Sequence, residues 1–321
     1  YRLLGAKCIE LTMTKICIKK LFIRTLAGIL LALTTLFFIL WWLPALFLPL
    51  VSNPSPYQPL PISSLTMQCQ IATERGAFSY CISRDPESKS ERVIYHFHGR
   101  NGNERWWNDD TYYTGEINQH WRKKGAEVPT VVSVSLGPLW LLNQDSLRQF
   151  NEVLIPNIES TLPFNVAERL AVGESMGGVN VLTLWGQGAS KFDGVAALCP
   201  PLPTVSPYDD LKSLISYLGS STTSIQRGLM MIIMGRALYE SDEQWRALDV
   251  IEALKDDKNS ITTPLYLSCG KRDDWGCMDG SLSLVALAKR RNIPLQWEPR
   301  DGGHCDIDSE SLADYLIAQH Q

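Results

Sequence analysis

The feature that most constrains this chain is a glycine-rich turn at residues 173–177, which reads Gly-Glu-Ser-Met-Gly. A β-type run, Leu170–Val172, precedes the turn, and a helix-compatible run follows from Val179. A strand that turns this sharply into a helix crowds the backbone, and glycine relieves the crowding because it has no Cβ. Ser175 is therefore expected to stand exposed at a strand end, with the N–H of Met176 pointing at the same spot. A glycine-rich connection without any chemistry is the competing interpretation.

The rest of the chain alternates between β-type runs and helix-compatible runs. Strands are expected at 66–72, 77–83, 92–97, 129–136, 168–172, 192–198, 264–268 and 295–298, the first two flanking a turn at Glu74-Arg75-Gly76. Helices are expected up to about 124 and at 146–160, 179–186, 281–290 and 309–318. This order predicts an α/β fold with a mostly parallel sheet and an antiparallel start.

An exposed serine becomes a nucleophile only beside a base, which in turn needs an acid to orient it. In sites of this kind the chain order is serine, acid, histidine. Of the five histidines, only His304 and His320 follow Ser175, and His320 is the penultimate residue, so His304 is the candidate base. The acid is expected just past the next-to-last strand, where Asp273 is preferred and Asp274 is the rival. Both aspartates also fit a solvated surface charge cluster.

A second backbone donor for a developing oxyanion is expected directly after the third strand. His98-Gly99-Arg100 stands there, and the donor would be the N–H of Gly99 or Arg100, beside that of Met176. A metal site at His96 and His98 is not expected, because no third ligand completes a familiar set. No cofactor is expected either.

Several apolar residues fall where they would surround this serine. Trp106, Trp107 and Trp140 lie in loops at the same expected sheet edge, where they would bind an acyl or aromatic group or simply pack. The strongly apolar stretch Arg227–Leu238 lies in an insertion at 203–263. It reads equally well as a lid helix that faces an acyl pocket and as a crossover helix that packs on the core.

The N-terminal part of the chain predicts a membrane anchor. An uncharged, mostly apolar run, Thr25–Leu43, is close to the roughly 20 residues that span a bilayer as a helix. Trp41 and Trp42 fit an interfacial aromatic belt, and basic residues precede the run: Lys15, Lys19, Lys20 and Arg24. The expected division is a cytoplasmic segment 1–24, a single-pass signal-anchor 25–51, a Pro-rich linker 52–63 and a globular domain 64–321. A cleaved signal peptide is the alternative.

Eight cysteines fit an oxidising compartment, outside the cytoplasm. Two precede the expected anchor, which leaves six beyond it: Cys69, Cys81, Cys199, Cys269, Cys277 and Cys305. The first two flank the expected hairpin and are the expected disulfide. A bridge between Cys277 and Cys305 would tie together the loops of the acid and the base, and the remaining two read as buried thiols because they end apolar runs.

Together these motifs resemble the α/β-hydrolase fold, in particular the esterase branch that includes feruloyl esterases and S-formylglutathione hydrolases. The resemblance covers the chain from about Ser64 onward, and its motifs occur in the family's order: His98-Gly99, the six residues from Gly173 to Gly178, Gly270-Lys271-Arg272-Asp273 and Gly302-Gly303-His304. It implies a mostly parallel central sheet flanked by helices, with a helical cap at 203–263. It also implies Ser175 as nucleophile, His304 as base, Asp273 as acid, and an oxyanion hole from Met176 and Gly99 or Arg100.

The expected activity is therefore hydrolysis of a carboxylic ester, either a small molecule or a lipid, through an acyl-enzyme in the periplasm or the extracellular space. A thioesterase, acyltransferase or peptidase on the same triad is an alternative, as is a catalytically silent, membrane-tethered binding module. A net charge of -4 and the lack of a basic stripe with interleaved aromatic residues exclude nucleic acid as a partner. The sequence predicts no oligomeric state.

Overall fold

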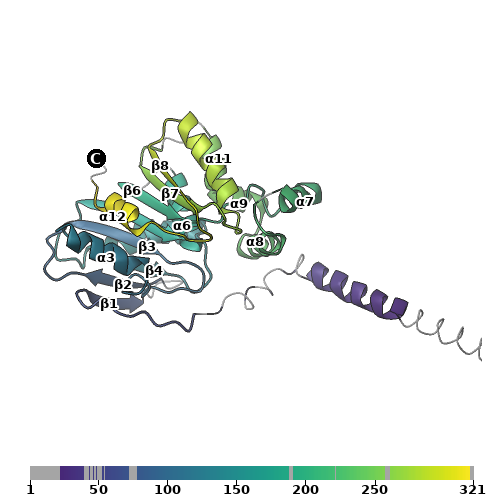
Figure 1. The fold of residues 1–321 in the computed structure, drawn as a ribbon, viewed down its shortest axis with the longest axis horizontal. Coiled ribbons are helices and arrows are strands. Elements are labelled where there is room, and N and C mark those ends of the chain that lie inside the picture. Colours follow the sequence, from purple (N-terminus) through teal and green to yellow (C-terminus); the bar gives the residue numbers. More distant parts are fainter. Residues whose placement is uncertain are drawn as a thin grey trace, which may run out of the picture.

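The core of the molecule is an eight-stranded sheet with the strand order β1-β2-β4-β3-β5-β6-β7-β8 (Figure 1). The computed structural model describes residues 22–39, 43, 46, 48, 53, 55–71, 78–187, 191–220, 222–256 and 261–318. The strands are β1 (Thr66–Ile71), β2 (Ser79–Arg84), β3 (Arg92–Phe97), β4 (Thr130–Ser135), β5 (Glu168–Glu174), β6 (Gly194–Leu198), β7 (Leu265–Gly270) and β8 (Leu295–Arg300). β2 runs antiparallel to β1 and β4, and all other pairs are parallel. The expected mostly parallel sheet with an antiparallel start is confirmed.

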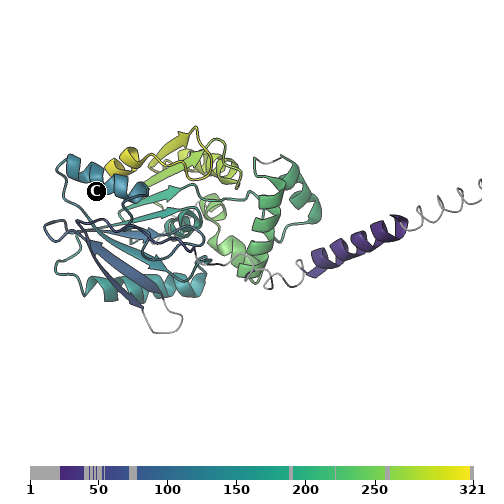
Figure 2. The same cartoon turned by 60° about the horizontal axis from the view of Figure 1, so that its bottom comes forward.

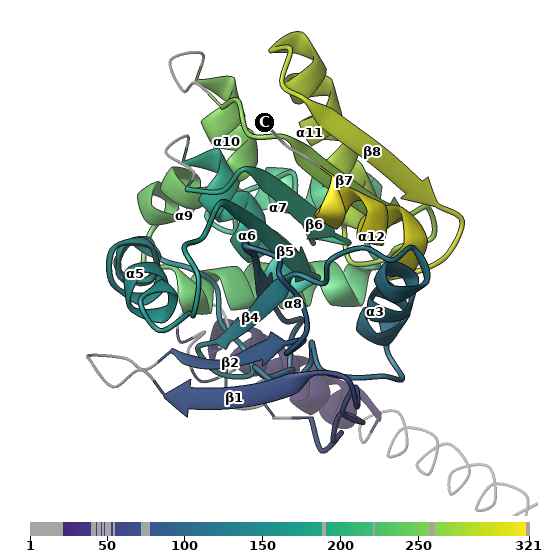
Figure 3. The same ribbon diagram turned by 90° about the vertical axis from the view of Figure 1, so that its left-hand side faces the viewer.

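Helices cover both faces of this sheet, as its continuously buried central strands require. Successive strand residues point to opposite faces, so Ile94 packs with one layer and Tyr95 with the other. The first layer contains α3 (Tyr113–Lys123) and α12 (Ser309–Ile317), and the second contains α5 (Ile155–Glu159), α6 (Met176–Gly186), α10 (Val250–Lys255) and α11 (Cys277–Arg290). Figure 3 shows α3 and α12 on one side and α5, α6 and α10 on the other.

The single helix expected at 146–160 is divided into three pieces. α4 (Gln144–Gln149) passes into a π-helical turn, η2 (Phe150–Leu154), and then into α5. The N–H of Ile155 bonds to the carbonyl of Phe150, five residues back, and Pro156 follows with no N–H to offer. The apolar stripe along 146–160 predicts a helix, but it does not predict that one turn of this helix has the wider, five-residue hydrogen-bond spacing of a π-helix.

Three disulfides join parts of the described chain, and two of them differ from the expected pairing. Cys69 and Cys81 lie directly opposite each other on β1 and β2 and are bonded, as expected. The other bonds are Cys199–Cys305 and Cys269–Cys277. The predicted Cys277–Cys305 bridge is therefore wrong, and so is the prediction that Cys199 and Cys269 are free thiols. Cys199 and Cys269 follow or end strands at the carboxyl edge of the sheet, where the loops of their partners pass.

The insertion between β6 and β7 forms α7 (Leu211–Ser220), α8 (Ile225–Leu238), α9 (Asp242–Leu248) and α10. α7 and α8 project from the sheet, as Figure 2 shows, and pack on each other around Leu214, Tyr217 and Ile232. α10 instead returns to the main body, where Val250 and Leu254 join the core beneath α6. The part of the insertion that stands apart is therefore the helix pair α7–α8, which we call the cap.

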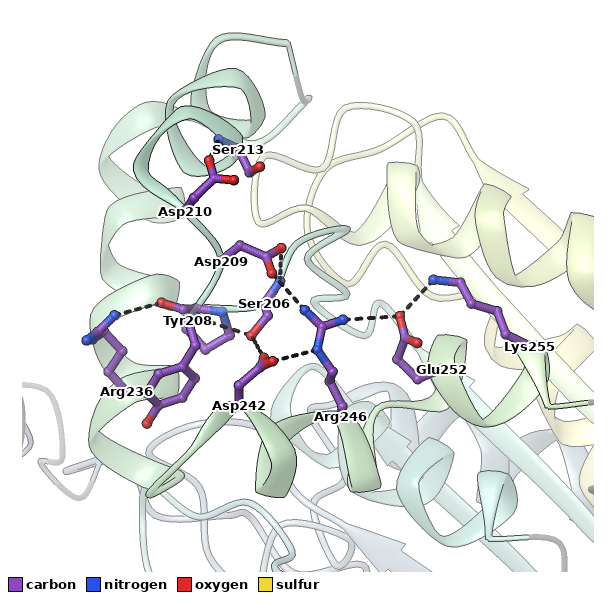
Figure 4. A network of polar contacts seen from close by, with 11 residues as sticks. Ser206, Tyr208, Asp209, Asp210, Ser213, Arg236, Asp242, Arg246, Glu252 and Lys255 are labelled. Atoms are coloured by element: carbon purple, nitrogen blue, oxygen red, sulfur yellow. Dashed lines mark hydrogen bonds and ion pairs between the residues drawn. The ribbon is translucent and has the colours of Figure 1, made fainter.

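A polar network holds the base of the cap (Figure 4). The guanidinium of Arg246 on α9 contacts Asp209 at 2.7 Å and Asp242 at 2.8 Å, and lies 3.6 Å from Glu252 on α10. The hydroxyl of Ser206 donates to Asp242 at 2.5 Å. Each exposed pair contributes little by itself, but one guanidinium shared by three carboxylates fixes three segments relative to one another.

The N-terminal helix Phe22–Ile39 is long and apolar enough to cross a membrane and has none of its surface buried in the rest of the chain. A signal sequence has the same properties. The described part of the helix includes the three residues before the expected span, and Trp41 and Trp42 lie outside the described residues. The expected linker differs in one respect: from Ser55 onward the chain is docked on the domain, where Ile62 is buried and its N–H donates to Asn108.

The close packing of β5, α6 and β3 yields a stability prediction. A Cβ on Gly177 would overlap the carbonyl oxygen of Phe97, and backbone at this position cannot yield easily. Gly177→Ala should lower the free energy of unfolding by about 3 kcal/mol. Gly219→Ala on α7 is the matched control, because a Cβ there meets nothing within 4 Å and alanine favours a helix. Urea unfolding would measure both variants, and equal midpoints would contradict this packing.

Candidate active site

Ser175 sits on the sharp turn between β5 and α6. Its backbone has φ 54° and ψ -116°, a conformation that non-glycine residues rarely adopt. The N–H of Ser175 donates to the carbonyl of Leu198 on β6 at 2.8 Å, and its carbonyl accepts the N–H of Val179 in the first turn of α6. A Cβ on Gly173 would overlap the backbone of Gly177. Both glycines of the motif are thus required by close approach, as the sequence predicted.

The structure brings the imidazole of His304 to this serine. His304 Nε2 lies 2.8 Å from Ser175 Oγ, and His304 Nδ1 lies 2.5 Å from Asp273 Oδ2. The Asp273 carboxylate is buried, and its other oxygen accepts the N–H of Trp275 at 2.8 Å and of Cys277 at 3.4 Å. These bonds aim one oxygen at the imidazole, so that Nδ1–H donates to Asp273 and Nε2 faces the serine proton.

Asp274, the rival acid, points away from the histidine. It pairs with Arg227 on α8, and its side chain is 45% exposed. The guanidinium of Arg227 also lies over the ring of Trp275, 4.6 Å from its centre, and that ring stands 5.6 Å from the ring of His304. The two neighbouring aspartates therefore divide their contacts, one to the imidazole and one to the cap.

Two disulfides lie beside these residues. Cys199–Cys305 ties the residue after His304 to the end of β6, and Cys269–Cys277 closes the loop that carries Asp273. Thiolates are what bind metal ions, and these sulfurs are instead paired with each other. His304 lies beside the first pair of sulfurs and Asp273 beside the second, and both side chains are bonded within the serine site.

A buried carboxylate lies directly behind the serine. Glu174 accepts the N–H of Gly99 at 2.8 Å on one oxygen, and contacts His96 Nε2 and the hydroxyl of Tyr113, each at 2.9 Å, on the other. Burial by itself raises the pKa of Glu174, but His96 and these hydrogen bonds more than offset it and hold the pKa below its usual value. The N–H of Gly99, one of two expected oxyanion donors, is thus already engaged.

His98 binds the carbonyl of Gly99, which belongs to the next peptide group, the one that contains the N–H of Arg100. Its Nε2 receives the indole N–H of Trp140 at 3.2 Å, so Nδ1 carries the proton and donates to the carbonyl of Gly99 at 2.7 Å. Burial lowers the pKa of His98 to about 4, which keeps the ring neutral. With both its N–H and its carbonyl bound to buried side chains, Gly99 fixes the position of the following residue, Arg100.

A pocket of about 320 Å³ opens beside Ser175 and His304. Its walls are mostly apolar: Trp106, Tyr112, Leu139, Leu141, Met176, Val179, Pro201, Pro203, Met231, Met234, Leu238, Tyr239, Trp245 and Trp275. Four residues of α8 line the pocket: Met231, Met234, Gly235 and Leu238. The stretch Arg227–Leu238 therefore faces the pocket, which is the first of the two interpretations that the sequence left open, a lid helix. The volume is at the lower end of the range for sites of small organic ligands.

Of the three tryptophans expected around the pocket, only Trp106 lines it. Trp107 is fully buried and stacks on Trp121 of α3. Trp140 is buried against Phe78 and Phe97 and bonds His98. A loop tryptophan can turn toward the core as readily as toward a pocket, and the sequence alone does not reveal which way it turns.

The sequence missed the contributions of Trp245 and Trp275 to the pocket. Trp275 stands two residues after Asp273, a spacing that places it at the site. Trp245 gives no such signal, because it lies on α9 and reaches the pocket only through the fold of the insertion between β6 and β7. Of the other histidines, His120 bonds Asp314 between α3 and α12, and His320 lies outside the described residues.

Comparison with known proteins agrees with this fold. A family model described as "Putative esterase" matches residues 143–309, more than half of the 321 residues. A ferulic acid esterase is similar in structure with a TM-score of 0.56 at 16% identity, over 79% of this chain and 95% of that one. Esterase B from Lactobacillus rhamnosis has a TM-score of 0.56 at 12% identity, over 81% of this chain and 88% of that one. An S-formylglutathione hydrolase from Agrobacterium tumefaciens has a TM-score of 0.53 at 13% identity, over 81% of this chain and 95% of that one. No curated protein matches the sequence.

The burial of His98 predicts a pH dependence of stability. In the folded chain this imidazole stays neutral down to pH about 4, whereas in the unfolded chain it binds a proton below its ordinary pKa of 6.5. The unfolded state binds more protons between these values, so this residue alone should cost about 3 kcal/mol of stability as the pH falls from 6.5 to 4. His98→Gln should reduce that pH dependence in urea unfolding, and an identical dependence in both proteins would contradict it.

Proposed function

The chain belongs to the Putative esterase family, a serine hydrolase family of α/β-hydrolase fold, and we propose that it cleaves carboxylic esters through an acyl-enzyme on Ser175. The observation that carries this proposal is the unbroken line from Ser175 Oγ to His304 to Asp273, with separations of 2.8 Å and 2.5 Å. Hydrogen-bond contact between a serine, an imidazole and a buried carboxylate is the arrangement that activates a hydroxyl.

In the first half of the reaction, Ser175 Oγ attacks the ester carbonyl carbon while its proton moves to His304 Nε2. Asp273 stabilises the resulting imidazolium and keeps the ring oriented. When the tetrahedral intermediate collapses, the C–O bond to the alcohol breaks and His304 returns the proton to the departing oxygen. In the second half a water molecule loses a proton to His304 and attacks the acyl carbon. The C–O bond to Ser175 then breaks, His304 returns the proton to Ser175 Oγ, and the carboxylic acid leaves.

The oxyanion of the tetrahedral intermediate needs donors that are already in place. The N–H of Met176 opens α6 and lies at the positive end of that helix. The second proposed donor is the N–H of Arg100, because that of Gly99 donates to Glu174. The bonds from Glu174 and His98 to Gly99 support this role, since they fix the peptide that leads into Arg100.

The acyl group is proposed to occupy the apolar pocket. Met231, Met234 and Leu238 from α8 form one wall, and Trp275 stands between that wall and His304. Methionine side chains adapt to different apolar shapes, which suits acyl groups of more than one length. Among the described residues that line the pocket, the acidic and basic side chains near the nucleophile are Arg100, Glu174 and His304, and the rest of the wall is mostly apolar. Such a wall favours an uncharged acyl chain.

We further propose that the helix Phe22–Ile39 anchors the chain in a membrane, with the catalytic domain outside the cytoplasm. The hydropathy and exposure of the helix support the anchor, and the basic residues before it support the orientation. Three disulfides support an oxidising compartment for the domain. In this arrangement the substrate is either a soluble ester or a membrane lipid.

Removal of the nucleophile tests the proposed activity. Ser175→Ala should lower kcat/KM for p-nitrophenyl butyrate by at least about 10⁴-fold, because no acyl-enzyme can form. Ser160→Ala is the control, since that serine is exposed at the end of α5 and does not line the pocket. Thioester and amide analogues assayed in parallel would show whether the oxygen ester is preferred. Full activity in a folded Ser175→Ala variant would refute the assignment.

The two neighbouring aspartates provide a matched pair. Asp273→Asn should lower kcat by about 10³- to 10⁴-fold with little change in KM, because the amide no longer favours the required imidazole tautomer. Asp274→Asn should stay within about threefold of the parent, since it breaks only a half-exposed ion pair with Arg227. Steady-state kinetics would separate the two, and a larger loss in the Asp274 variant would reverse the assignment.

A further inference from the structure

The chain enters the catalytic domain at the rim of the active site. The N–H of Ser55 donates to the carbonyl of Asn101 at 2.9 Å, next to Arg100, which lines the pocket. From there residues 55–62 run along the loop 100–111, where Leu60 and Ile62 bond the side chains of Asp109 and Asn108. The same loop supplies Trp106 to the pocket. The point at which the N-terminal part of the chain is attached is therefore the mouth of the serine site.

The length of chain before this point limits how the domain can face a membrane. Fifteen residues, 40–54, separate Ile39, the last described residue of the apolar helix, from Ser55. They can span at most about 55 Å, and a domain of this size is about 45 Å across. To turn the rim fully away from the bilayer, those residues would have to follow half the circumference of the domain, about 70 Å for a body of this width, which exceeds their reach. The rim is accordingly the face that the attachment holds toward the membrane.

The cap exposes apolar side chains on the same side of the molecule. Leu211 and Ile215 are 62% and 60% exposed and lie one turn apart on α7, and Ile225 and Leu229 repeat the pattern on α8 at 62% and 39%. Within described residues 78–318, the other large apolar side chains this exposed are Val153 and Leu282, which lie on other elements. Figures 1 and 2 show α7 and α8 on the side where the N-terminal helix lies.

α8 connects this exposed surface with the interior of the site. Ile225 and Leu229 face outward, whereas Met231, Met234 and Leu238 of the same helix line the pocket. At its N-terminal end, Arg227 pairs with Asp274 and lies over Trp275, beside the catalytic histidine. An apolar molecule that leaves a bilayer along α8 would thus keep apolar contacts from the outer face of the cap to Ser175.

We propose that the outer faces of α7 and α8 dock on the lipid surface to which the chain is anchored, and that the site draws its ester substrate from that bilayer. The substrate class is a membrane-soluble ester with an apolar acyl chain. The four exposed side chains would enter the interfacial layer, where binding strength grows with the apolar area buried. This inference rests on the proposed esterase activity and on the proposed anchor.

The test uses the full-length chain in vesicles of phosphatidylcholine and phosphatidylglycerol. The variant carries Leu211→Gln, Ile215→Gln, Ile225→Gln and Leu229→Gln, none of which lines the pocket. It should hydrolyse soluble p-nitrophenyl butyrate like the parent, but lose about tenfold or more of the rate on p-nitrophenyl laurate dissolved in the bilayer. The control carries Val153→Gln and Leu282→Gln, which change exposed apolar side chains on other elements, and should match the parent on both esters.

The two substrates separate the possible failures. If the parent hydrolyses neither ester, the proposed esterase activity fails. If the parent hydrolyses the soluble ester but the bilayer ester reacts equally fast with the cap variant and the control, the docking inference alone is overturned. That second result, in vesicles that contain no other protein, is also what would be seen if a protein partner covered α7 and α8. Equal unfolding midpoints for the parent and both variants would exclude misfolding as the cause of any loss.

Discussion

The structure depends on one crowded point, where β5 turns into α6. Ser175 can hold φ 54° there only because Gly173 and Gly177 let the backbone of the turn and of β3 come into contact. A strained conformation of this kind costs of order 1–3 kcal/mol and persists when the surroundings determine it. Here the hydrogen bond to Leu198 on β6 and the start of α6 do so. The turn therefore fixes the position of Ser175, and the other groups of the site are placed relative to it.

Polar side chains lie on two sides of Ser175. In front, His304 and Asp273 come from loops after β8 and β7, and two disulfides tie those loops to the sheet edge. Behind, Glu174 and His98 bind the two polar groups of Gly99. Both are buried, and one is held ionised while the other is held neutral. The polar groups therefore serve orientation, and the apolar cap supplies the space for a substrate.

The sequence predicted the sheet, the turn and the three residues that meet because each has a local signal: glycines at a strand end, or a polar residue just after an apolar run. It did not predict which loop residues turn inward. Trp107 and Trp140 pack in the core, whereas Trp245 on α9 lines the pocket through the fold of the insertion between β6 and β7. The partners of Cys199 and Cys269 were missed for the same reason, because pairing depends on which loops pass the sheet edge. Tertiary packing decides these contacts, and spacing along the chain does not reveal them.

The central claim is that Ser175 is made nucleophilic by the geometry around it. Covalent labelling with a fluorophosphonate tests this without any assumption about the natural substrate, because the reagent reacts only with an activated serine. Peptide mass spectrometry of the labelled protein should find a single adduct on the peptide that contains Ser175, and heat-unfolded protein should show none. A folded protein that stays unlabelled, or one labelled at another serine, would contradict the account.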